Sequence, residues 1–380
     1  MRRVLHLRSS AGFYGAERVL VTLLKRLPAL GIDPVLACIQ DYRDGNTDLM
    51  QAAAAAGIAV IELPCRARLN PGVLRHLLSA TRENRVDCIH THDYKSHLYG
   101  MLAARLSGVP IVATLHGWTS ERGVLRLYQH IEAILLRGYA CVITVEPSMA
   151  ERLRKLGLPT EIVRTIENGV DTEVFSPLAP RLGRARWGLT PDHFVFGTIG
   201  RLSPEKGQRY AIEAFSMAAK DHPRARLVLI GDGPDRAGLQ QLSASLGVAE
   251  KIILAGVETA VERSIPDLDC YVSPSLSEGM PMILLEAMAS GALIIATAVG
   301  GIEKMLEGGV GVLVPAGDSR SLADTMERAL RAEFPRWAIG ERARTRCLAR
   351  YSAMRQAQRY AGLYRDVEYA NRVERTAVGA

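Results

Sequence analysis

Two cations share a loop in the second half of the chain. The apolar run Phe194–Gly200 predicts a strand, and Arg201 and Lys206 follow it within one loop. Because they are five positions apart, both could reach a single phosphate-bearing ligand. A fork-shaped guanidinium beside a compact ammonium suits a diphosphate leaving group. The alternative interpretation of this loop is two solvated surface cations.

Two carboxylates flank the start of a predicted helix further along the chain. Cys270–Ser273 predicts a strand, and Pro281 suits the first turn of the helix that follows. Glu278 lies at the mouth of this helix, whereas Glu286 lies inside it among apolar residues, where burial without a partner would be costly. We expect the carboxylates to hold sugar hydroxyls while the backbone of Gly279–Met282 faces phosphate. The alternative is a capping glutamate and a surface glutamate.

A third candidate loop lies near the N-terminus. Gly12 and Gly15 stand between the predicted strand Val4–Leu7 and the amphipathic segment Ala16–Leu27. Glycines at this position let backbone N–H groups approach an anion, and the helix start adds a favourable dipole. The loop matches neither the dinucleotide-binding glycine pattern nor the lysine-bearing P-loop. An ordinary tight turn explains it equally well.

The elements that must position these loops alternate between strand and helix from end to end. Such alternation predicts βαβ units and parallel, doubly wound sheets, whose ligands bind beyond the carboxyl ends of the strands. The irregular segment Asp171–Pro191 predicts a linker between two Rossmann-like domains with a cleft between them. The further predicted strands are Pro34–Ile39, Ala59–Leu63, Cys88–His90, Ile111–Leu115, Cys141–Val145, Leu227–Gly231, Ile252–Ala255, Leu293–Thr297 and Val312–Val314.

Length, composition and charge narrow the class of protein. The 380 residues are 48% hydrophobic and 23% charged, which is typical of two globular domains and excludes a disordered chain. The first 170 residues hold 21 basic and 15 acidic side chains, against 26 and 25 in the rest. This excess suits an anionic membrane surface or an acidic substrate. With 6% aromatic residues and no basic–aromatic module, we expect no nucleic-acid partner.

Six scattered cysteines, without a C-x-x-C pair, predict reduced core cysteines in a cytoplasmic protein. The N-terminal residues begin a strand at once and carry no signal-peptide pattern. The longest apolar stretch falls short of the ~18 residues that a membrane-spanning helix needs. We therefore expect a soluble protein that associates with a membrane, if at all, only at its surface.

Several weak motifs in a fixed order identify the chain as similar to a known family. Over residues 1–365 it resembles the group 1 glycosyltransferases (glycosyltransferase family 4) of the two-domain GT-B fold. The matching segments are Gly15–Arg18, Thr114–Gly117, Glu167–Asp171 leading to Phe175–Pro177, Gly200–Arg201 with Lys206–Gly207, Gly231–Pro234, the E-x7-E pair Glu278 and Glu286, Val299–Gly301, and Leu313–Pro315 with Asp318.

The resemblance implies a retaining transfer of a sugar from a nucleoside-diphosphate sugar to an acceptor hydroxyl, without a metal or cofactor. Residues 1–170 would form the acceptor-side domain, with a C-terminal helix at about 354–380 crossing back onto it. Residues 171–353 would form the donor domain. The implied catalytic residues are Arg201, Lys206, Glu278 and His116, and the implied donor-binding residues are Gly15, Gly200, Gly279, Met280, Pro281, Met282 and Glu286.

Within this assignment, Arg201 and Lys206 neutralise the departing diphosphate. Glu278 holds the donor sugar, and Glu286 binds the nucleoside ribose. Gly15 belongs to the loop that approaches the diphosphate, while His116 stands beside the donor sugar.

Some positions depart from the family pattern. Glu146 stands where a serine is usual, so it either affects the choice of donor or acceptor or is a solvated turn residue. Leu293 replaces a proline, and Ile302-Glu303 replaces a proline–acid pair. Asp267-Leu268-Asp269 resembles the D-x-D metal motif of other glycosyltransferases, but it precedes a strand, so we expect it to hold no metal.

Three histidines, His90, His92 and His97, have close spacing that could suggest a metal site, but we interpret them as acceptor contacts or loop histidines. The basic segment Arg66–Arg85 carries Leu74, Leu77 and Leu78 on one face. It predicts either a helix resting on anionic lipid or a solvated helix that covers the sheet.

The predicted partners are a nucleoside-diphosphate sugar and a saccharide or lipid-linked acceptor, in the assembly of a cell-surface polysaccharide or glycolipid. The alternatives are a sugar-nucleotide 2-epimerase on the same fold and an inactive partner subunit of a glycosyltransferase complex. The complete set of Arg201, Lys206, Glu278 and Glu286 argues against both.

Overall fold

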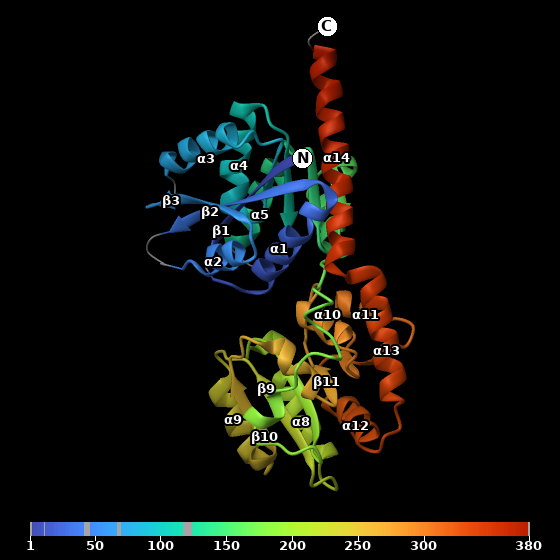
Figure 1. Cartoon of the computed structure of the whole chain (residues 1–380). Coiled ribbons are helices and arrows are strands. Elements are labelled where there is room, and N and C mark those ends of the chain that lie inside the picture. Colours follow the sequence, from blue (N-terminus) through green and yellow to red (C-terminus); the bar gives the residue numbers. More distant parts are fainter. Residues whose placement is uncertain (1, 11, 42–45, 67–69, 117–123, 379–380) are drawn as a thin grey trace. The chain divides into compact units, whose positions relative to one another are not determined.

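The chain folds into two α/β units. The computed structural model describes all residues except 1, 11, 42–45, 67–69, 117–123 and 379–380, and it leaves out the side chains of residues 10, 41, 124–128, 372 and 374–378. One unit comprises Met1–Gly169 and Ala353–Ala380, and the other Val170–Ser352 (Figure 1). Each contains a parallel sheet, which confirms the predicted two-domain, Rossmann-like GT-B fold.

The first unit is built on a seven-stranded sheet of order β3-β2-β1-β4-β5-β6-β7. Its central strands are buried, as the near-continuous apolar runs of a covered parallel sheet require. β7 is only three residues long, and the sequence pattern did not predict it. The strands are β1 (Arg2–Ser10), β2 (Ile32–Asp41), β3 (Ala59–Cys65), β4 (Cys88–Thr91), β5 (Ile111–Leu115), β6 (Cys141–Thr144) and β7 (Val163–Thr165).

Helices cover both faces of this sheet, and the last helix of the chain belongs to it. Tyr360 and Tyr364 of that helix, α14, are fully buried against β1, β4 and β6 in one apolar core. The other face packs against α3, α4 and α6. The helices are α1 (Gly15–Arg26), α2 (Asp48–Ala55), α3 (Pro71–Glu83), α4 (Tyr94–Ser107), α5 (Val124–Leu136), α6 (Pro147–Lys155) and α14 (Ala353–Val378).

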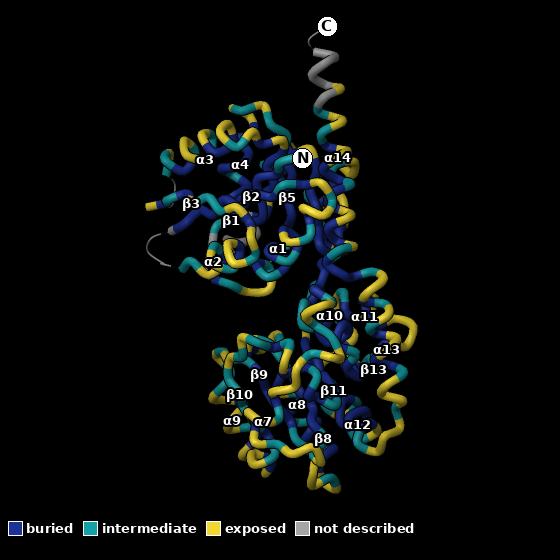
Figure 2. Tube along the Cα trace, in the orientation of Figure 1, coloured by how far each residue is buried: buried dark blue, intermediate teal, exposed yellow. Residues whose placement is uncertain are grey.

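The second unit has a six-stranded sheet of order β10-β9-β8-β11-β12-β13. Two apolar clusters line its two faces, and Figure 2 shows the buried strands between more exposed helices. Its strands are β8 (Phe194–Ile199), β9 (Ala225–Ile230), β10 (Ile252–Gly256), β11 (Cys270–Ser273), β12 (Ile294–Thr297) and β13 (Val312–Val314). Its helices are α7 (Gly183–Arg186), α8 (Gln208–Ala218), α9 (Arg236–Ser245), α10 (Met282–Ala289), α11 (Gly301–Leu306), α12 (Ser319–Leu330) and α13 (Arg336–Arg346).

The structure corrects one sequence interpretation and decides between the two alternatives given for another. Asp171–Pro191 is not a free linker, because it contains α7 and its Trp187 is buried in the core of the second unit. The apolar residues of α3 face inward: Leu77 is fully buried, and Leu74 and Leu78 pack against the sheet core. α3 therefore covers the sheet rather than offering an apolar face to lipid. Ala67 and Arg68 lie outside the described residues.

Other expectations are confirmed. All six cysteines are free and buried. Among the described residues, no helix is both long and apolar enough to cross a membrane.

Candidate functional site

The predicted donor loops meet at the point where the strand order of the second sheet reverses. β8 and β11 are neighbours, although β9 and β10 separate them in sequence. The Arg201 loop follows β8 and the Glu278 loop follows β11, so topology brings them to one edge. Open α/β sheets bind ligands at such a switch point.

An ion pair joins the two loops. Lys206 Nζ lies 2.6 Å from Glu278 Oε1, and the Ser275 hydroxyl donates to the same oxygen over 2.8 Å. The Glu278 side chain is 10% exposed and the Lys206 side chain is 27% exposed. The carboxylate is therefore nearly buried, while the lysine side chain is partly open to solvent. A partly buried, hydrogen-bonded pair of this kind holds both groups in fixed positions before a ligand arrives.

Backbone packing around two glycines fixes the shape of this edge. Gly207 has a φ of 65°, and a Cβ there would lie 2.2 Å from the Pro274 carbonyl oxygen. Gly300 has a φ of 52°, and its Cβ would lie 1.8 Å from the Glu278 carbonyl oxygen. Only glycine permits both the left-handed backbone and the close approach. The loops are therefore held by direct backbone contact.

The remaining predicted donor residues line the same region. Gly200 closes β8, and its N–H donates to Ile230 O over 2.9 Å. Arg201 is exposed and makes no ion pair within the second unit, which is fully described. Pro281 is the N-cap of α10, one position earlier than the first helical turn predicted for it.

Glu286 lies in the middle of α10 and is buried, as its apolar surroundings predicted. The half-exposed backbone of Gly279, Met280 and Met282 leads into this helix.

The first unit has a corresponding edge, where β1 and β4 are neighbours at its own reversal of strand order. Arg8, at the end of β1, donates to Glu17 Oε1 over 2.9 Å and to the His92 carbonyl over 3.2 Å. Asp93, after β4, accepts from the backbone N–H of Ser9 over 2.7 Å. This edge is therefore closed by its own hydrogen bonds.

Five imidazoles are gathered behind this edge. His6 Nδ1 lies 3.1 Å from His92 Nε2, and His92 Nδ1 lies 3.3 Å from His116 Nε2. Burial lowers the pKa of His6 and of His116 to about 3, and that of His97 to about 4. Burial also holds the pKa of His90 and His92 well below its usual range. Burial therefore favours the neutral form of these rings, although His97 Nε2 also lies 3.3 Å from the buried Glu132 Oε1, which favours its charged form.

The structure corrects the interpretation of three of these histidines. His90, His92 and His97 are buried side chains of a network rather than loop histidines. The ring nitrogens of His6, His90 and His92 lie within 4.8 Å of one another, a spacing that could hold a metal ion. Both His90 nitrogens, however, are already hydrogen-bonded, to Tyr364 over 2.7 Å and to Thr114 over 2.8 Å.

The predicted residues of the first unit occupy this edge. His116 follows β5, and its Nδ1 is buried without a partner among the described residues. Gly15 is exposed and begins α1. Gly117, which completes the Thr114–Gly117 motif, lies outside the described residues. Glu146 is the half-buried N-cap of α6, and burial raises the pKa of its carboxyl group.

The D-x-D segment is structural. Asp267 accepts from the backbone N–H of Gly183 over 2.6 Å, and Asp269 pairs with Arg184 over 2.7 Å and with Arg336 over 2.8 Å. Both carboxylates precede β11, at the opposite end of the strand from Glu278. The contacts therefore agree with the interpretation that this segment is not part of the donor site.

Sequence reasoning missed three polar residues of these edges. Arg8, Asp93 and Ser275 each hold another site group in place, as described above. All three stand at or just after the end of a strand, and that position was the available signal. Arg8 and Asp93 interact with residues 84 positions away, so these partners could not be read from local spacing, whereas Ser275 contacts Glu278 only three positions along the chain.

Two family models match the chain. Residues 13–174 match "Glycosyltransferase Family 4", and residues 183–346 match "Glycosyl transferases group 1". The matches fall on the first and the second unit respectively, apart from the residues at the junction near 170.

Curated relatives and solved structures agree with these models. An Escherichia coli protein, UDP-Gal:alpha-D-GlcNAc-diphosphoundecaprenol alpha-1,3-galactosyltransferase, is 27% identical over 79% of this chain and 80% of its own. A Bacillus anthracis N-acetyl-alpha-D-glucosaminyl L-malate synthase is 27% identical over 76% of each chain. Anabaena HepE in complex with UDP superimposes with a TM-score of 0.83, at 21% identity over 96% of this chain and 100% of its own, which supports the fold.

Proposed function

The chain is a group 1 glycosyltransferase of family 4, and on that premise we propose that it moves the sugar of a nucleoside-diphosphate donor to an acceptor hydroxyl with retention of anomeric configuration. The observation that carries the proposal is the Lys206–Glu278 pair, fixed by Ser275 beside the unpaired, exposed Arg201. This arrangement offers cations to a diphosphate and a carboxylate to sugar hydroxyls.

The proposed step moves negative charge onto the leaving group. The bond between the anomeric carbon and the diphosphate oxygen breaks, and the diphosphate takes the electron pair. Positioned cations such as Lys206 and Arg201 stabilise this developing charge more in the transition state than in the ground state. The acceptor oxygen bonds to the anomeric carbon, and its proton passes to the departing diphosphate. Attack on the face that the diphosphate leaves gives retention.

The two loops divide the work in this proposal. Glu278 orients the donor sugar while it anchors Lys206, and Glu286 holds the ribose from within α10. Gly200, Gly279, Met280, Pro281 and Met282 let the backbone approach the donor. We also propose Gly15 as a donor-binding residue and His116 as a catalytic residue.

A transfer assay tests the proposal. The purified full chain is incubated with UDP-galactose, UDP-glucose, UDP-N-acetylglucosamine or GDP-mannose, with and without a lipid-linked saccharide acceptor. We expect nucleoside diphosphate release that depends on acceptor, survives EDTA, and gives a product with the donor's anomeric configuration by proton NMR. Release without any acceptor would favour epimerisation or hydrolysis, and no release from any donor would favour an inactive partner subunit.

We further propose that the acceptor belongs to a cell-surface polysaccharide or glycolipid and that a cytoplasmic enzyme meets it at a membrane surface. The Escherichia coli relative is named for a substrate linked to diphosphoundecaprenol, which supports this proposal. The excess of basic side chains in residues 1–170 supports it as well. Leu106 of α4 and Ile134 of α5 are exposed apolar side chains in the first unit. We expect co-sedimentation with vesicles of anionic lipid at low salt and its loss at high salt. Absence of binding at low salt would refute the membrane proposal.

A further inference from the structure

A cavity lies in the second unit, away from the donor loops. Its volume is about 650 Å³, which is within the range of small-molecule sites. Segments that precede β11 and β12 line it, whereas the donor loop follows β11. It therefore opens at the opposite edge of the sheet, and the function proposed above does not use it.

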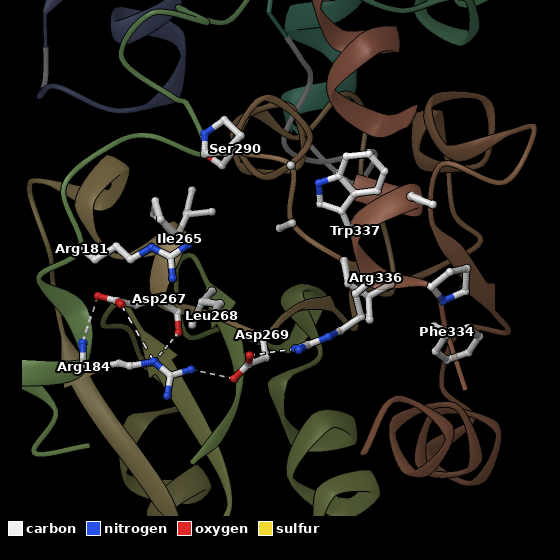
Figure 3. A pocket seen from close by; sticks show the side chains of 17 residues that line it. Arg181, Arg184, Ile265, Asp267, Leu268, Asp269, Ser290, Phe334, Arg336 and Trp337 are labelled. Carbon is white, nitrogen blue, oxygen red and sulfur yellow. Dashed lines mark hydrogen bonds and ion pairs between the residues drawn. The ribbon is translucent and has the colours of Figure 1, made fainter. Parts of the chain in front are cut away.

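The charges around this cavity leave one cation unmatched. Arg184 and Arg336 both pair with Asp269, and Asp267 accepts from the backbone beside Arg184 (Figure 3). Arg181 is exposed and makes no ion pair anywhere in the second unit. The lining is thus a neutralised acid–base network with one free guanidinium, which favours a ligand with a single anionic group.

An exposed aromatic ring forms another wall. Trp337, in the first turn of α13, is 77% exposed. Figure 3 shows it and Arg181 projecting from different segments around the cavity. A solvent-facing indole provides a flat apolar surface with a polar edge, a combination that makes tryptophan frequent at interfaces.

A buried hydroxyl in the wall has no partner. Ser290, just after α10, is 6% exposed, and its Oγ makes no hydrogen bond in the structure. Buried polar groups in native proteins are almost always satisfied by protein, water or ligand. The wall of the cavity thus contains a hydroxyl that the described residues leave unused, although its oxygen lies beneath the surface of the wall.

From these observations we propose that the cavity binds an anionic saccharide. A sugar ring stacks its C–H face on the Trp337 indole, its hydroxyls hydrogen-bond to water, and a carboxylate or phosphate on the sugar pairs with Arg181. Asp267 and Asp269 in the wall disfavour polyanions such as nucleic acid. Because the cavity and the donor loops lie at opposite edges of the sheet, the saccharide and the donor bind without competing.

Calorimetric titration of the full chain tests this site with defined probes. We expect tri-galacturonate to bind with a Kd of about 0.1 mM, and neutral maltotriose to bind at least about tenfold more weakly because it offers Arg181 no anion. Inorganic phosphate tests whether the anion alone is recognised, and galactose 6-phosphate tests whether a phosphorylated sugar substitutes for a uronate.

Matched variants place the binding in the cavity. Trp337→Ala and Arg181→Gln should each weaken tri-galacturonate binding about tenfold or more. Tyr369→Ala, an exposed aromatic on α14, and Arg320→Gln, an exposed arginine outside the cavity, should leave it unchanged. UDP titration of the same samples reports on the donor loops and should not change, so failure of this site and failure of the proposed function are distinguishable.

Three results would overturn the proposal. The first is that no saccharide probe binds at concentrations up to about 10 mM, because a Kd above that value is too weak for a binding site. The second is phosphate binding as tight as that of tri-galacturonate, which would indicate a simple anion site. The third is concentration-dependent self-association that Trp337→Ala abolishes in sedimentation experiments, which would assign the surface to contacts between copies of the chain.

Discussion

The two sheets present chemically different carboxyl edges at equivalent positions. In the first unit, the reversal between β1 and β4 gathers neutral imidazoles and the buried Arg8–Glu17 pair, whose charges are matched internally. In the second unit, the reversal between β8 and β11 leaves Lys206 partly exposed and Arg201 without an ion pair to any described residue. The same topology therefore builds one edge whose charged side chains are paired, although His116 Nδ1 has no partner among the described residues, and one edge that offers cations to an anion.

This difference suggests a division of labour. A charge that is free to meet a ligand retains its electrostatic effect for that ligand, whereas a charge already paired and buried mainly supports the local structure. Substitutions at the first edge should therefore lower the free energy of unfolding more than they lower turnover. Substitutions at the second edge should lower turnover more than the free energy of unfolding.

The largest effect should come from acid. Each of the five buried histidines of the first unit has a pKa lowered by burial, so the unfolded chain binds protons that the folded chain does not. Stability is then greatest above the unfolded pKa near 6.5 and falls as pH drops toward the lowered values. Between pH 7 and 5.5 the loss is about 1 kcal/mol for each histidine, or roughly 5 kcal/mol in all.

Hydrogen–deuterium exchange, corrected for the pH dependence of intrinsic exchange, would measure this loss separately in each unit. Protection of β1 and β4 should fall, while that of β8 and β11 should not, because the second unit has no buried histidine. His76→Gln, at an exposed site, should behave as wild type. Equal loss of protection in both units would contradict the comparison.

Breaking the buried pair of the first edge should cost nearly as much. Glu17→Gln leaves the Arg8 guanidinium, whose side chain is 11% exposed, without its carboxylate. We expect the free energy of unfolding to fall by about 4 kcal/mol. Urea titration monitored by circular dichroism would measure this, with Glu205→Gln, an exposed carboxylate in the second unit, as the matched control. A loss no larger than that of the control would show that the pair does not support the edge.

At the second edge, Lys206→Ala should act on turnover. The expected loss is on the order of 3 kcal/mol of transition-state stabilisation, a fall in kcat of more than a hundredfold. The free energy of unfolding should change by less than about 1 kcal/mol, because the pair is partly exposed. Arg320→Gln should keep full turnover. If Lys206→Ala retained normal kcat, the assignment of the diphosphate site would be wrong.

The smallest effect should come from the backbone that shapes the second edge. Gly300→Ala places a Cβ against the Glu278 carbonyl oxygen and should displace the loop, lowering kcat/KM about tenfold. Gly247→Ala has a similar φ of 69° but open space around its Cβ, so it adds backbone strain without moving the site. Steady-state kinetics and thermal melting of the two variants separate strain from displacement. Equal kcat/KM values would refute the positioning role of Gly300.

The fold was largely predictable because its signals are local. Apolar runs of three to seven residues predict buried parallel strands, and all of those predicted here are present. β7 was not predicted although β13 is equally short, because Arg164 and Thr165 of β7 are polar and exposed and leave no apolar run. Asp171–Pro191 was misread as a linker because its prolines and glycines indicate irregular backbone, which describes its path but not the packing of Trp187.

The residue types of the candidate site were predictable, but the contacts between these residues were not. Motif order alone placed Arg201, Lys206, Glu278 and Glu286 on loops and a helix start of the second unit. It did not show that Lys206 and Glu278 are already paired. Their partnership spans 72 positions, and only the adjacency of β8 and β11 creates it.

The sequence by itself determined the family, the alternation of strands and helices, and the loops that carry charge, because these depend on residue type and short spacing. The tertiary structure decided which charges are free. Whether a histidine is a solvated base or a neutral network member, or whether α3 faces lipid or core, depends on burial by distant segments. The desolvation and the pairing of an ionisable side chain depend on the residues packed around it, and these residues come together only when the chain folds.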